Sequence, residues 1–371
     1  MSVDLGAVLR ADEERLELDR LEVVLNELSG EVSGTVEWAD GQVGLDLELE
    51  SGKGQSIRAL VSAIPAAYSS DLDGLRASGT YSLSAKVQGH VSGQEDHAPS
   101  FWASLRVRNG KLQRADLPLP LEDIEIAATL AHPGGHLDEM HVDIHGLTLR
   151  AGQSHVEGKL SISTPLTNLY LEAALNGRVD FTELSQAYPL PDDAELEGKL
   201  GFDLDLAAKG ERVRRCSGWM NATAFAYLPE NAPHFRVSAA SLSLGPRATK
   251  VDSFYGTYGS SDLKVKGTLS PLTTVLRPDA PVVGNLTLDS QFINLDDFLE
   301  GDVAEIPQTL DITITATAIK LQRKKIVLSD MKGVVLIKDG EVKLTKVRSD
   351  TQRKKVEALL DSLPKAGRVL K

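Results

Sequence analysis

Residues 155–163 (HVEGKLSIS) and 168–176 (NLYLEAALN) alternate apolar residues with polar or small ones. Residues 196–209 (LEGKLGFDLDLAAK) follow the same pattern, with an apolar residue at every second position from Leu200 onward. Alternation with a period of two is typical of a β-strand that has one apolar face. This part of the chain therefore predicts an amphipathic β-sheet.

A short helix is predicted between these strands. Residues 179–188 (VDFTELSQAY) place Phe181, Leu184 and Tyr188 at helical spacing. Asp180 stands directly before them, and aspartate is a favoured N-cap residue. We therefore expect one or two helical turns that begin after Asp180.

The same order of features recurs on both sides of this stretch. Residues 56–60 (SIRAL) and 294–298 (NLDDF) stand in the corresponding place between alternating segments. Gly34, Gly158 and Gly267 mark equivalent positions, 124 and 109 residues apart. This spacing is longer than that of common solenoid repeats and is the size of a small domain.

Length and repeat together predict the domain organisation. A chain of 371 residues suggests two or three domains, but an all-β repeat can continue as one sheet. We predict an all-β fold with a few short helices: one continuous, elongated, curled antiparallel sheet over residues 1–371. Its repeat units span approximately 16–130, 131–250 and 251–350. Residues 351–371 are predicted to form a short amphipathic helix, because their apolar residues fall at helical spacing.

Several local predictions follow from turn chemistry and repeat position. Residues 16–25 fit a helix or a strand, and their place in the repeat favours a strand. Residues 31–49, 105–112 and 333–347 each contain an Asp-Gly or Asn-Gly dipeptide. These dipeptides between alternating segments predict β-hairpins.

Composition excludes several classes of function. The net charge of −13 argues against nucleic acid as a partner, because phosphates require a clustered basic surface. The single cysteine, Cys216, excludes an intramolecular disulfide and a cysteine-based zinc site. No nucleophile-elbow, P-loop or dinucleotide-binding motif occurs. We therefore expect that the protein is not an enzyme and binds no cofactor. The chain also has no signal peptide pattern and no run of 18 apolar residues.

One cluster of histidines allows a metal site. His141, Asp143 and His145 would share one face of a strand, and two histidines with a carboxylate can bind a metal ion. The favoured interpretation is a solvated face of the sheet opposite Val142 and Ile144. We therefore predict no metal ligands.

Two further features have structural and functional interpretations. Residues 323–325 and 353–355 are short basic runs that could contact anionic headgroups, but solvated ends of strands or helices are favoured. Trp102 and Trp219 occupy matching positions in the repeat, which favours structural packing over ligand stacking.

The main question is what covers the apolar face of so many amphipathic strands. One answer is a closed barrel or sandwich. The other is a curled sheet whose aliphatic face lines a groove suited to acyl chains, each buried methylene contributing about 0.8 kcal/mol. The candidate groove positions, chosen by alternation, are Leu169, Leu171, Leu200, Phe202, Leu204, Leu206, Ile312 and Ile314.

The chain also resembles a known family. Residues 101–126, 158–167, 179–184 and 196–200 resemble the C-terminal repeat region of AsmA-like proteins, relatives of TamB and other bridge-like proteins of Gram-negative envelopes. The resemblance is best over residues 33–299. It consists of the spacing of the strands and of the Gly, Pro and Asp residues that separate them. It implies a taco-shaped β-sheet with a hydrophobic groove, located in the periplasm and tethered to the inner membrane by an anchor absent from this chain. It also implies a role in phospholipid transport and outer-membrane biogenesis or homeostasis.

The leading hypothesis is therefore a non-enzymatic lipid-binding segment. Its expected partners are phospholipid acyl chains, the inner membrane through the missing anchor, and other envelope proteins. The alternative is a structural or adhesive β-repeat protein with a closed core that binds protein partners. A metal-dependent enzyme built on His141 and His145 is the least favoured class.

Overall fold

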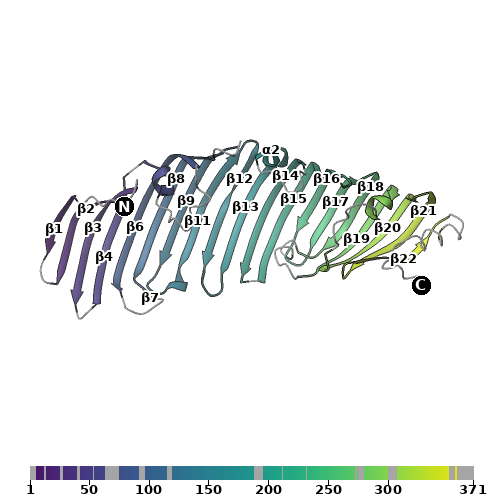
Figure 1. Cartoon of the computed structure of the whole chain (residues 1–371). Helices are drawn as coiled ribbons and strands as arrows, with labels where there is room; N and C mark the ends of the chain where they lie inside the picture. Colours follow the sequence, from purple (N-terminus) through teal and green to yellow (C-terminus); the bar gives the residue numbers. More distant parts are fainter. Residues whose placement is uncertain are drawn as a thin grey trace. The chain divides into compact units, whose positions relative to one another are not determined.

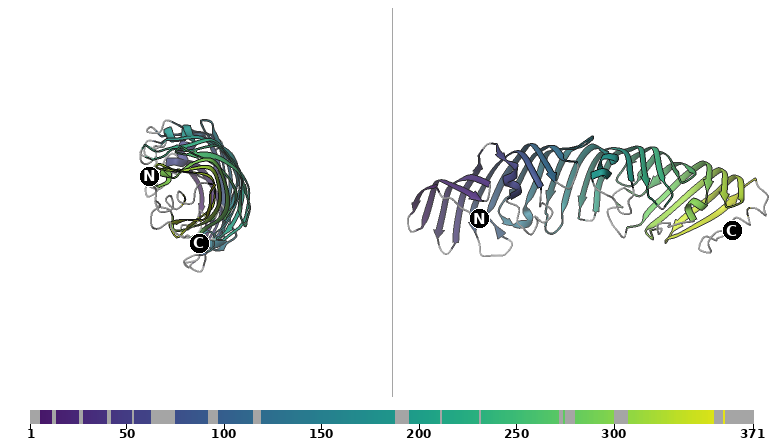
Figure 2. Two further views of the ribbon diagram at one scale, coloured as in Figure 1. Left: turned by 90° about the vertical axis from the view of Figure 1, so that its right-hand side faces the viewer. Right: turned by 45° about the horizontal axis from the view of Figure 1, so that its top comes forward.

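The computed structural model is nearly all β, with 79% of the described residues in strands and 6% in helices. It describes residues 6–11, 14–25, 28–39, 42–52, 54–62, 75–91, 97–114, 119–187, 195–210, 212–230, 232–271, 274, 280–299, 307–350 and 356. Most strand pairs are antiparallel, and the strands bend so that the sheet in each unit curls (Figure 2). The predicted all-β class is confirmed.

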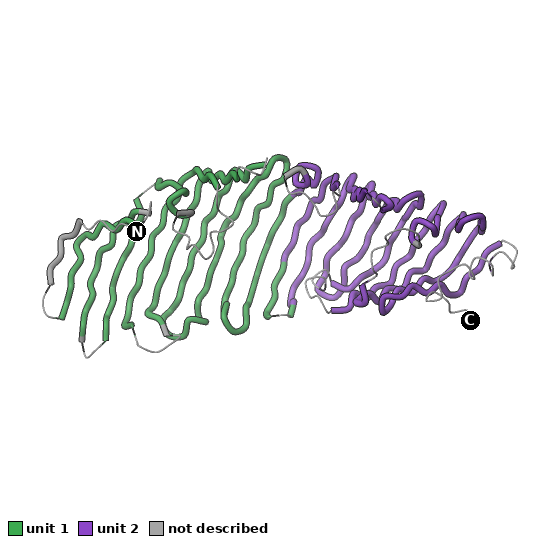
Figure 3. Tube along the Cα trace, in the orientation of Figure 1, with its two compact units in different colours: residues 1–177, 206–212 green, residues 178–205, 213–371 purple. Residues whose placement is uncertain are grey.

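The chain divides into two compact units (Figure 3). Unit 1 comprises Met1–Gly177 and Leu206–Arg212, and unit 2 comprises Arg178–Asp205 and Val213–Lys371.

Unit 1 is a sheet whose described pairs are all antiparallel (Figure 1). Its main strands pair in the order β1, β2, β3, β4, β6, β8, β9, β11, β12, while β5 pairs with β6, and β7 with β10. The elements are β1 (Gly6–Ala11), β2 (Arg15–Leu25), β3 (Leu28–Ala39), β4 (Gln42–Ser51), β5 (Gln55–Ser56), α1 (Ile57–Ser62), β6 (Leu75–Val91), β7 (His97–Ala98), β8 (Ser100–Arg114), β9 (Leu121–His132), β10 (Gly135–His136), a 3-10 turn (Leu137–Glu139), β11 (His141–Ala151), β12 (Ser154–Ser163) and β13 (Tyr170–Asp180), which ends at the start of unit 2.

Unit 2 also consists mainly of strands, and one of its strand pairs is parallel. The strands from β15 to β22 pair in chain order, all antiparallel except for the parallel pair β19 and β20. The elements are α2 (Phe181–Ala187), β14 (Glu195–Lys209), β15 (Arg212–Leu228), β16 (Phe235–Leu244), β17 (Thr249–Tyr258), β18 (Ser261–Leu269), β19 (Val282–Asn294), α3 (Asp296–Leu299), β20 (Leu310–Arg323), β21 (Ile326–Lys338) and β22 (Glu341–Arg348). The end of β14 from Leu206 onward and the first residue of β15 belong to unit 1. In the part of the chain that the structure describes, no pairing joins the first and last strands of either unit, so both sheets are open.

The strand registers give each sheet an apolar face and a polar face. Directly paired residues project to the same side of a sheet, so each cross-strand row belongs to one face. One apolar row in unit 1 consists of Val32, Leu49, Ala85, Ala103, Leu130, Val142 and Ile162. The adjacent row, on the other face, consists of Glu31, Glu50, Ser84, Ser104, Thr129, Asp143 and Ser161. The predicted alternation is therefore aligned from strand to strand.

Unit 2 has the same two-sided arrangement. An apolar row consists of Met220, Leu242, Val251, Gly267, Leu286, Ile314, Val335 and Leu344. A row on the opposite face consists of Trp219, Ser243, Lys250, Thr268, Asn285, Thr313, Leu336 and Lys343.

Buried cores form where the short helices pack on the sheet. In unit 1, the α1 residues Ile57 and Ala59 are buried together with Tyr81 and Val107. In unit 2, Phe298 of α3 packs on a buried cluster made of Ile293, Ala318, Leu321, Leu328 and Met331. Segments between strands therefore supply the residues that close these two cores.

The predicted helix after Asp180 is confirmed as α2. The Asp180 carboxylate accepts hydrogen bonds from the backbone N–H groups of Thr182, at 3.1 Å, and Glu183, at 3.4 Å. Both bonds satisfy N–H groups of the first helical turn, as expected of an N-cap.

The three glycines that marked the repeat share one structural role. A Cβ added to Gly34, which has a φ of +131°, would lie 2.0 Å from the carbonyl oxygen of Asp46 on the neighbouring strand. The corresponding distances at Gly158 and Gly267 are 2.3 and 2.2 Å. Only glycine allows the two backbones to approach this closely.

The local predictions had mixed outcomes. Residues 16–25 are in strand β2, and hairpins β3–β4 and β21–β22 are confirmed. The hairpin predicted within residues 105–112 is wrong, because β8 runs without interruption through Asn109 and Gly110. These two residues form a bulge instead, with Asn109 at a φ of 49°. Pairing of β8 with β6 and β9 along its length outweighs the local preference of an Asn-Gly dipeptide. Apart from residue 356, the predicted helix of residues 351–371 lies outside the described residues.

Candidate functional site

Three of the predicted groove residues lie in unit 1. Leu169 precedes β13 and is 41% exposed, and its carbonyl oxygen accepts a hydrogen bond from the Gly210 N–H at 2.7 Å. Leu171 on β13 and Leu206 on β14 are half-buried. Leu169 is therefore the most exposed of the three, since it lies just outside the strand.

Three more candidates lie on the part of β14 that belongs to unit 2. Leu200, Phe202 and Leu204 are half-buried. A Cβ added to Gly201 would lie 3.5 Å from the indole ring of Trp219, so Gly201 shares the face of that tryptophan. Alternation then places Leu200 and Phe202 on the opposite face, where the apolar rows lie.

The last two candidates belong to cross-strand rows of unit 2. Ile314 pairs with Val335, and Ile312 pairs with Ile337, which pairs in turn with Val342. Both candidates are half-buried, and Val342 is 37% exposed. The apolar face of unit 2 is therefore a mostly aliphatic surface that is only partly covered by the described residues.

A row of phenylalanines adds aromatic surface to this face. Phe181 of α2 contacts Phe225 edge to face, with ring centroids 5.4 Å apart. Phe225 and Phe235 are 6.4 Å apart, and Phe235 stacks on Phe254 at 6.1 Å. These separations are typical of favourable aromatic pairs. Alternation within one segment could not reveal the row, because its four members come from α2, β15, β16 and β17.

The histidine cluster lies on the polar face of unit 1. Asp143 belongs to the polar row described above, and the His145 ring nitrogen Nε2 lies 2.9 Å from the hydroxyl of Thr129. His141 Nδ1 lies 2.8 Å from the carbonyl oxygen of Glu139. Among the described residues, no group of three or more His, Cys, Asp or Glu side chains is arranged to hold a metal ion. The interpretation of these residues as a polar sheet face is confirmed.

Trp102 and Trp219 are 44% and 42% exposed, so both lie on the surface of the sheet rather than in a core. In the basic run 323–325, Lys324 and Lys325 are exposed, as predicted for a solvated strand end, whereas Arg323 is only 8% exposed. The reason is that Arg323 ends β20 two residues after the buried Leu321 and projects to the same face.

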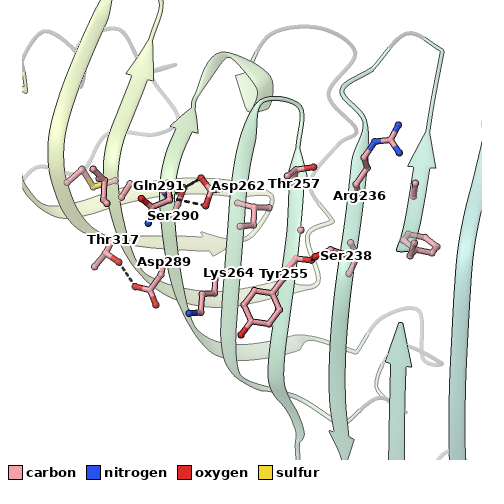
Figure 4. A pocket seen from close by; sticks show the side chains of 18 of the residues that line it. Arg236, Ser238, Tyr255, Thr257, Asp262, Lys264, Asp289, Ser290, Gln291 and Thr317 are labelled. Carbon is pink, nitrogen blue, oxygen red and sulfur yellow. Dashed lines mark hydrogen bonds between the residues drawn. The ribbon is translucent and has the colours of Figure 1, made fainter. Parts of the chain in front are cut away.

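The structure also contains a surface site that the sequence did not predict. A trough of about 1100 Å³ crosses strands β15 to β21 of unit 2. Figure 4 shows its side chains in two rows. The row that we call the tyrosine wall contains Ser238, Tyr255, Lys264, Asp289, Thr317 and Lys332. The row that we call the arginine wall contains Arg236, Thr257, Asp262, Gln291, Ile319 and Asp330.

Polar contacts hold several trough residues in place. The Lys264 ammonium lies 5.7 Å from the centroid of the Tyr255 ring, within the range of a cation–π contact. The hydroxyl of Thr317 donates to the Asp289 carboxylate at 2.5 Å. Arg236 lies 3.8 Å from the carboxylate of Glu197. The trough therefore carries charged groups of both signs along its walls, together with the exposed apolar side chain of Ile319.

Within the described residues, no helix is both long enough and apolar enough to cross a membrane. No protein-family model, curated protein or solved structure matches the chain.

Proposed function

We propose that the chain is a non-enzymatic segment that binds lipid acyl chains on its apolar sheet face. The observation that carries the proposal is the alignment of half-buried aliphatic side chains into continuous cross-strand rows, as in the row of unit 2 that contains Leu286, Ile314 and Val335. Such a surface offers apolar contact along its length and few hydrogen-bonding groups, which suits a hydrocarbon chain.

The proposed setting follows from the resemblance to AsmA-like proteins. The segment would act in the periplasm, tethered to the inner membrane. Its role would be phospholipid transport and outer-membrane biogenesis or homeostasis. Each methylene that leaves water contributes about 0.8 kcal/mol, so a single acyl chain on the apolar face would be strongly stabilised.

Native mass spectrometry with lipid extraction tests the proposal. The chain is expressed in the periplasm of a Gram-negative host, purified gently and compared with a Leu204→Asp, Ile314→Asp double variant. Phospholipid should copurify with the unchanged chain and be lost from the variant. The matched control is Thr315→Asp, which alters an exposed residue next to Ile314 on the opposite face and should leave the lipid bound.

A second measurement covers the case in which the double variant does not fold. A photo-crosslinking residue placed at 314 should label phospholipid, and the same residue placed at 315 should not. A folded chain that carries no lipid, or equal labelling from both positions, would contradict the proposal and favour a structural or adhesive β-repeat protein.

A further inference from the structure

We propose that the trough of unit 2, between the tyrosine wall and the arginine wall, binds an extended oligosaccharide without net charge. The proposal does not rest on lipid binding, because the trough lies on the other face of the sheet. The tyrosine wall follows the register row in which Tyr255 pairs with Lys264 and Lys264 with Asp289. The adjacent row, formed by Phe254, Val265 and Leu288, belongs to the apolar face.

Tyr255 provides an open aromatic surface for a sugar ring. Its side chain is 41% exposed. The Lys264 ammonium lies over the ring on one side, and on the other side Tyr255 pairs with Ala239, whose side chain is a single methyl group. The electron-rich face of an aromatic ring attracts the slightly positive C–H groups of a pyranose.

The groups around this ring match the hydroxyls of a sugar. Each hydroxyl both donates and accepts a hydrogen bond, so a sugar site needs donors and acceptors together. Along the walls, Lys264 and Gln291 provide donors, and Asp289 and Asp330 provide carboxylate acceptors. The acidic trough residues are Glu197, Asp262, Asp289 and Asp330, and the basic ones are Arg236, Lys264 and Lys332. The two signs nearly balance, which favours a neutral ligand over an anionic or cationic polymer.

The dimensions favour a chain of several sugars. Neighbouring strands are about 4.8 Å apart, so seven strands span roughly 29 Å of sheet. The strand spacing is close to the length of one pyranose unit, so successive sugars would meet equivalent positions on successive strands. A volume of about 1100 Å³ accommodates several rings.

The strands beneath the trough argue against an extended polypeptide. From β16 to β20, each strand pairs with a neighbour on both sides. Their backbone groups are therefore not free to pair with an added strand, which is the usual mode of extended-peptide recognition.

Isothermal titration calorimetry of the full chain with chitohexaose and with maltohexaose tests the proposal. At least one of the two probes should bind, and Tyr255→Ala should weaken that binding roughly tenfold through loss of the ring contact. Tyr255→Phe, which keeps the ring, should bind nearly as well as the unchanged chain. Ala239→Leu, which covers the open side of the ring, should weaken binding while Tyr255 remains.

The matched control is Trp219→Ala. Trp219 is also exposed on the polar face but lies outside the trough, so its loss should leave binding unchanged. Three outcomes would overturn the proposal: no binding of either probe, binding that is insensitive to both Tyr255→Ala and Ala239→Leu, or binding of an uncharged polar peptide such as a glycine-serine decamer in place of the sugars. Lipid copurification is measured separately, so failure of this inference leaves the proposed function unaffected.

Discussion

The Asp262 carboxylate on β18 accepts a hydrogen bond from the backbone N–H of Phe292 on β19, with Oδ1 2.7 Å from the nitrogen. The same carboxylate accepts the N–H of Gln291 at 3.0 Å and the hydroxyl of Ser290 at 3.1 Å. The backbone pairing of β18 with β19 ends at Lys264, so this side chain takes the place of the missing ladder bonds. It therefore links β18 to β19 within the arginine wall of the trough.

Asp262→Ala should therefore destabilise the end of β19. Two backbone N–H groups would lose their acceptor, at a cost of about 1–3 kcal/mol for a group that stays buried. Hydrogen exchange at the amides of Gln291 and Phe292 should accelerate strongly, and in Asp262→Asn, which retains one acceptor oxygen, it should accelerate less. Unchanged protection of both amides in the alanine variant would contradict this role.

Gly34→Ala should destabilise unit 1 by more than about 2 kcal/mol, because the new methyl group would overlap the Asp46 carbonyl and the backbone would have to leave its positive φ. Gly146→Ala is the matched control, since a Cβ there meets no heavy atom within 4 Å. It should change stability by less than about 0.5 kcal/mol. Urea unfolding followed by circular dichroism measures both, and equal midpoints for the two variants would refute the close-approach explanation.

Cys216 should react slowly with thiol reagents. Burial raises the pKa of its thiol, and the negative charge of Asp205 raises it further, so less thiolate is present at neutral pH. The rate of alkylation should rise at higher pH than for a free cysteine and become fast only in urea. Because the folded pKa lies above the unfolded one, the protonated thiol favours folding at low pH, and this contribution is lost as the pH rises through the folded pKa. Labelling of the native chain at the rate of a free thiol would contradict the burial.

Asp138 should hold the turn near residue 166 over a wide pH range. The hydroxyl of Thr167 donates to its carboxylate, and the backbone N–H groups of Leu166, at 2.8 Å, and Thr167, at 3.1 Å, do the same. The hydroxyl bond first, and then the backbone bonds, lower the pKa of Asp138. The contribution of the carboxylate is therefore present above the ordinary aspartate pKa of about 3.9 and is lost as the pH falls through the lower folded value.

Hydrogen exchange tests this contact. The amides of Leu166 and Thr167 should remain protected at a pH where an ordinary aspartate is half protonated, and Asp138→Ala should remove the protection at neutral pH. Equal exchange in the variant and the unchanged chain would show that the carboxylate does not hold the turn.

Much of the local structure could be predicted from the sequence, because its causes lie within a few residues. Alternation assigns residues 155–163 and 196–209 to strands and distinguishes their two faces. Asp180 predicts the start of α2 because its carboxylate satisfies N–H groups two and three residues ahead. The repeated glycines at 34, 158 and 267 could be aligned because each lies where a side chain would overlap the backbone of the neighbouring strand.

The candidate site could be predicted only in part. Alternation selects Ile312 and Ile314 as members of an apolar face, and their registers place them in aliphatic rows. The tyrosine wall was not predicted, because Tyr255 and Asp289 come together only through the pairing of β17, β18 and β19. Asn109 shows the opposite case, in which a strong local turn signal lost to strand pairing on both sides.

The sequence by itself determined that this protein is all β, that its strands are amphipathic and that short helices interrupt them. These properties depend on backbone preference and on the side-chain period, both of which are local. Only the tertiary structure decided the register of the strands, the phenylalanine row, the burial of Arg323 and the trough beside Tyr255. These depend on hydrogen bonds between neighbouring strands, where a shift of one residue would move every side chain to the other face.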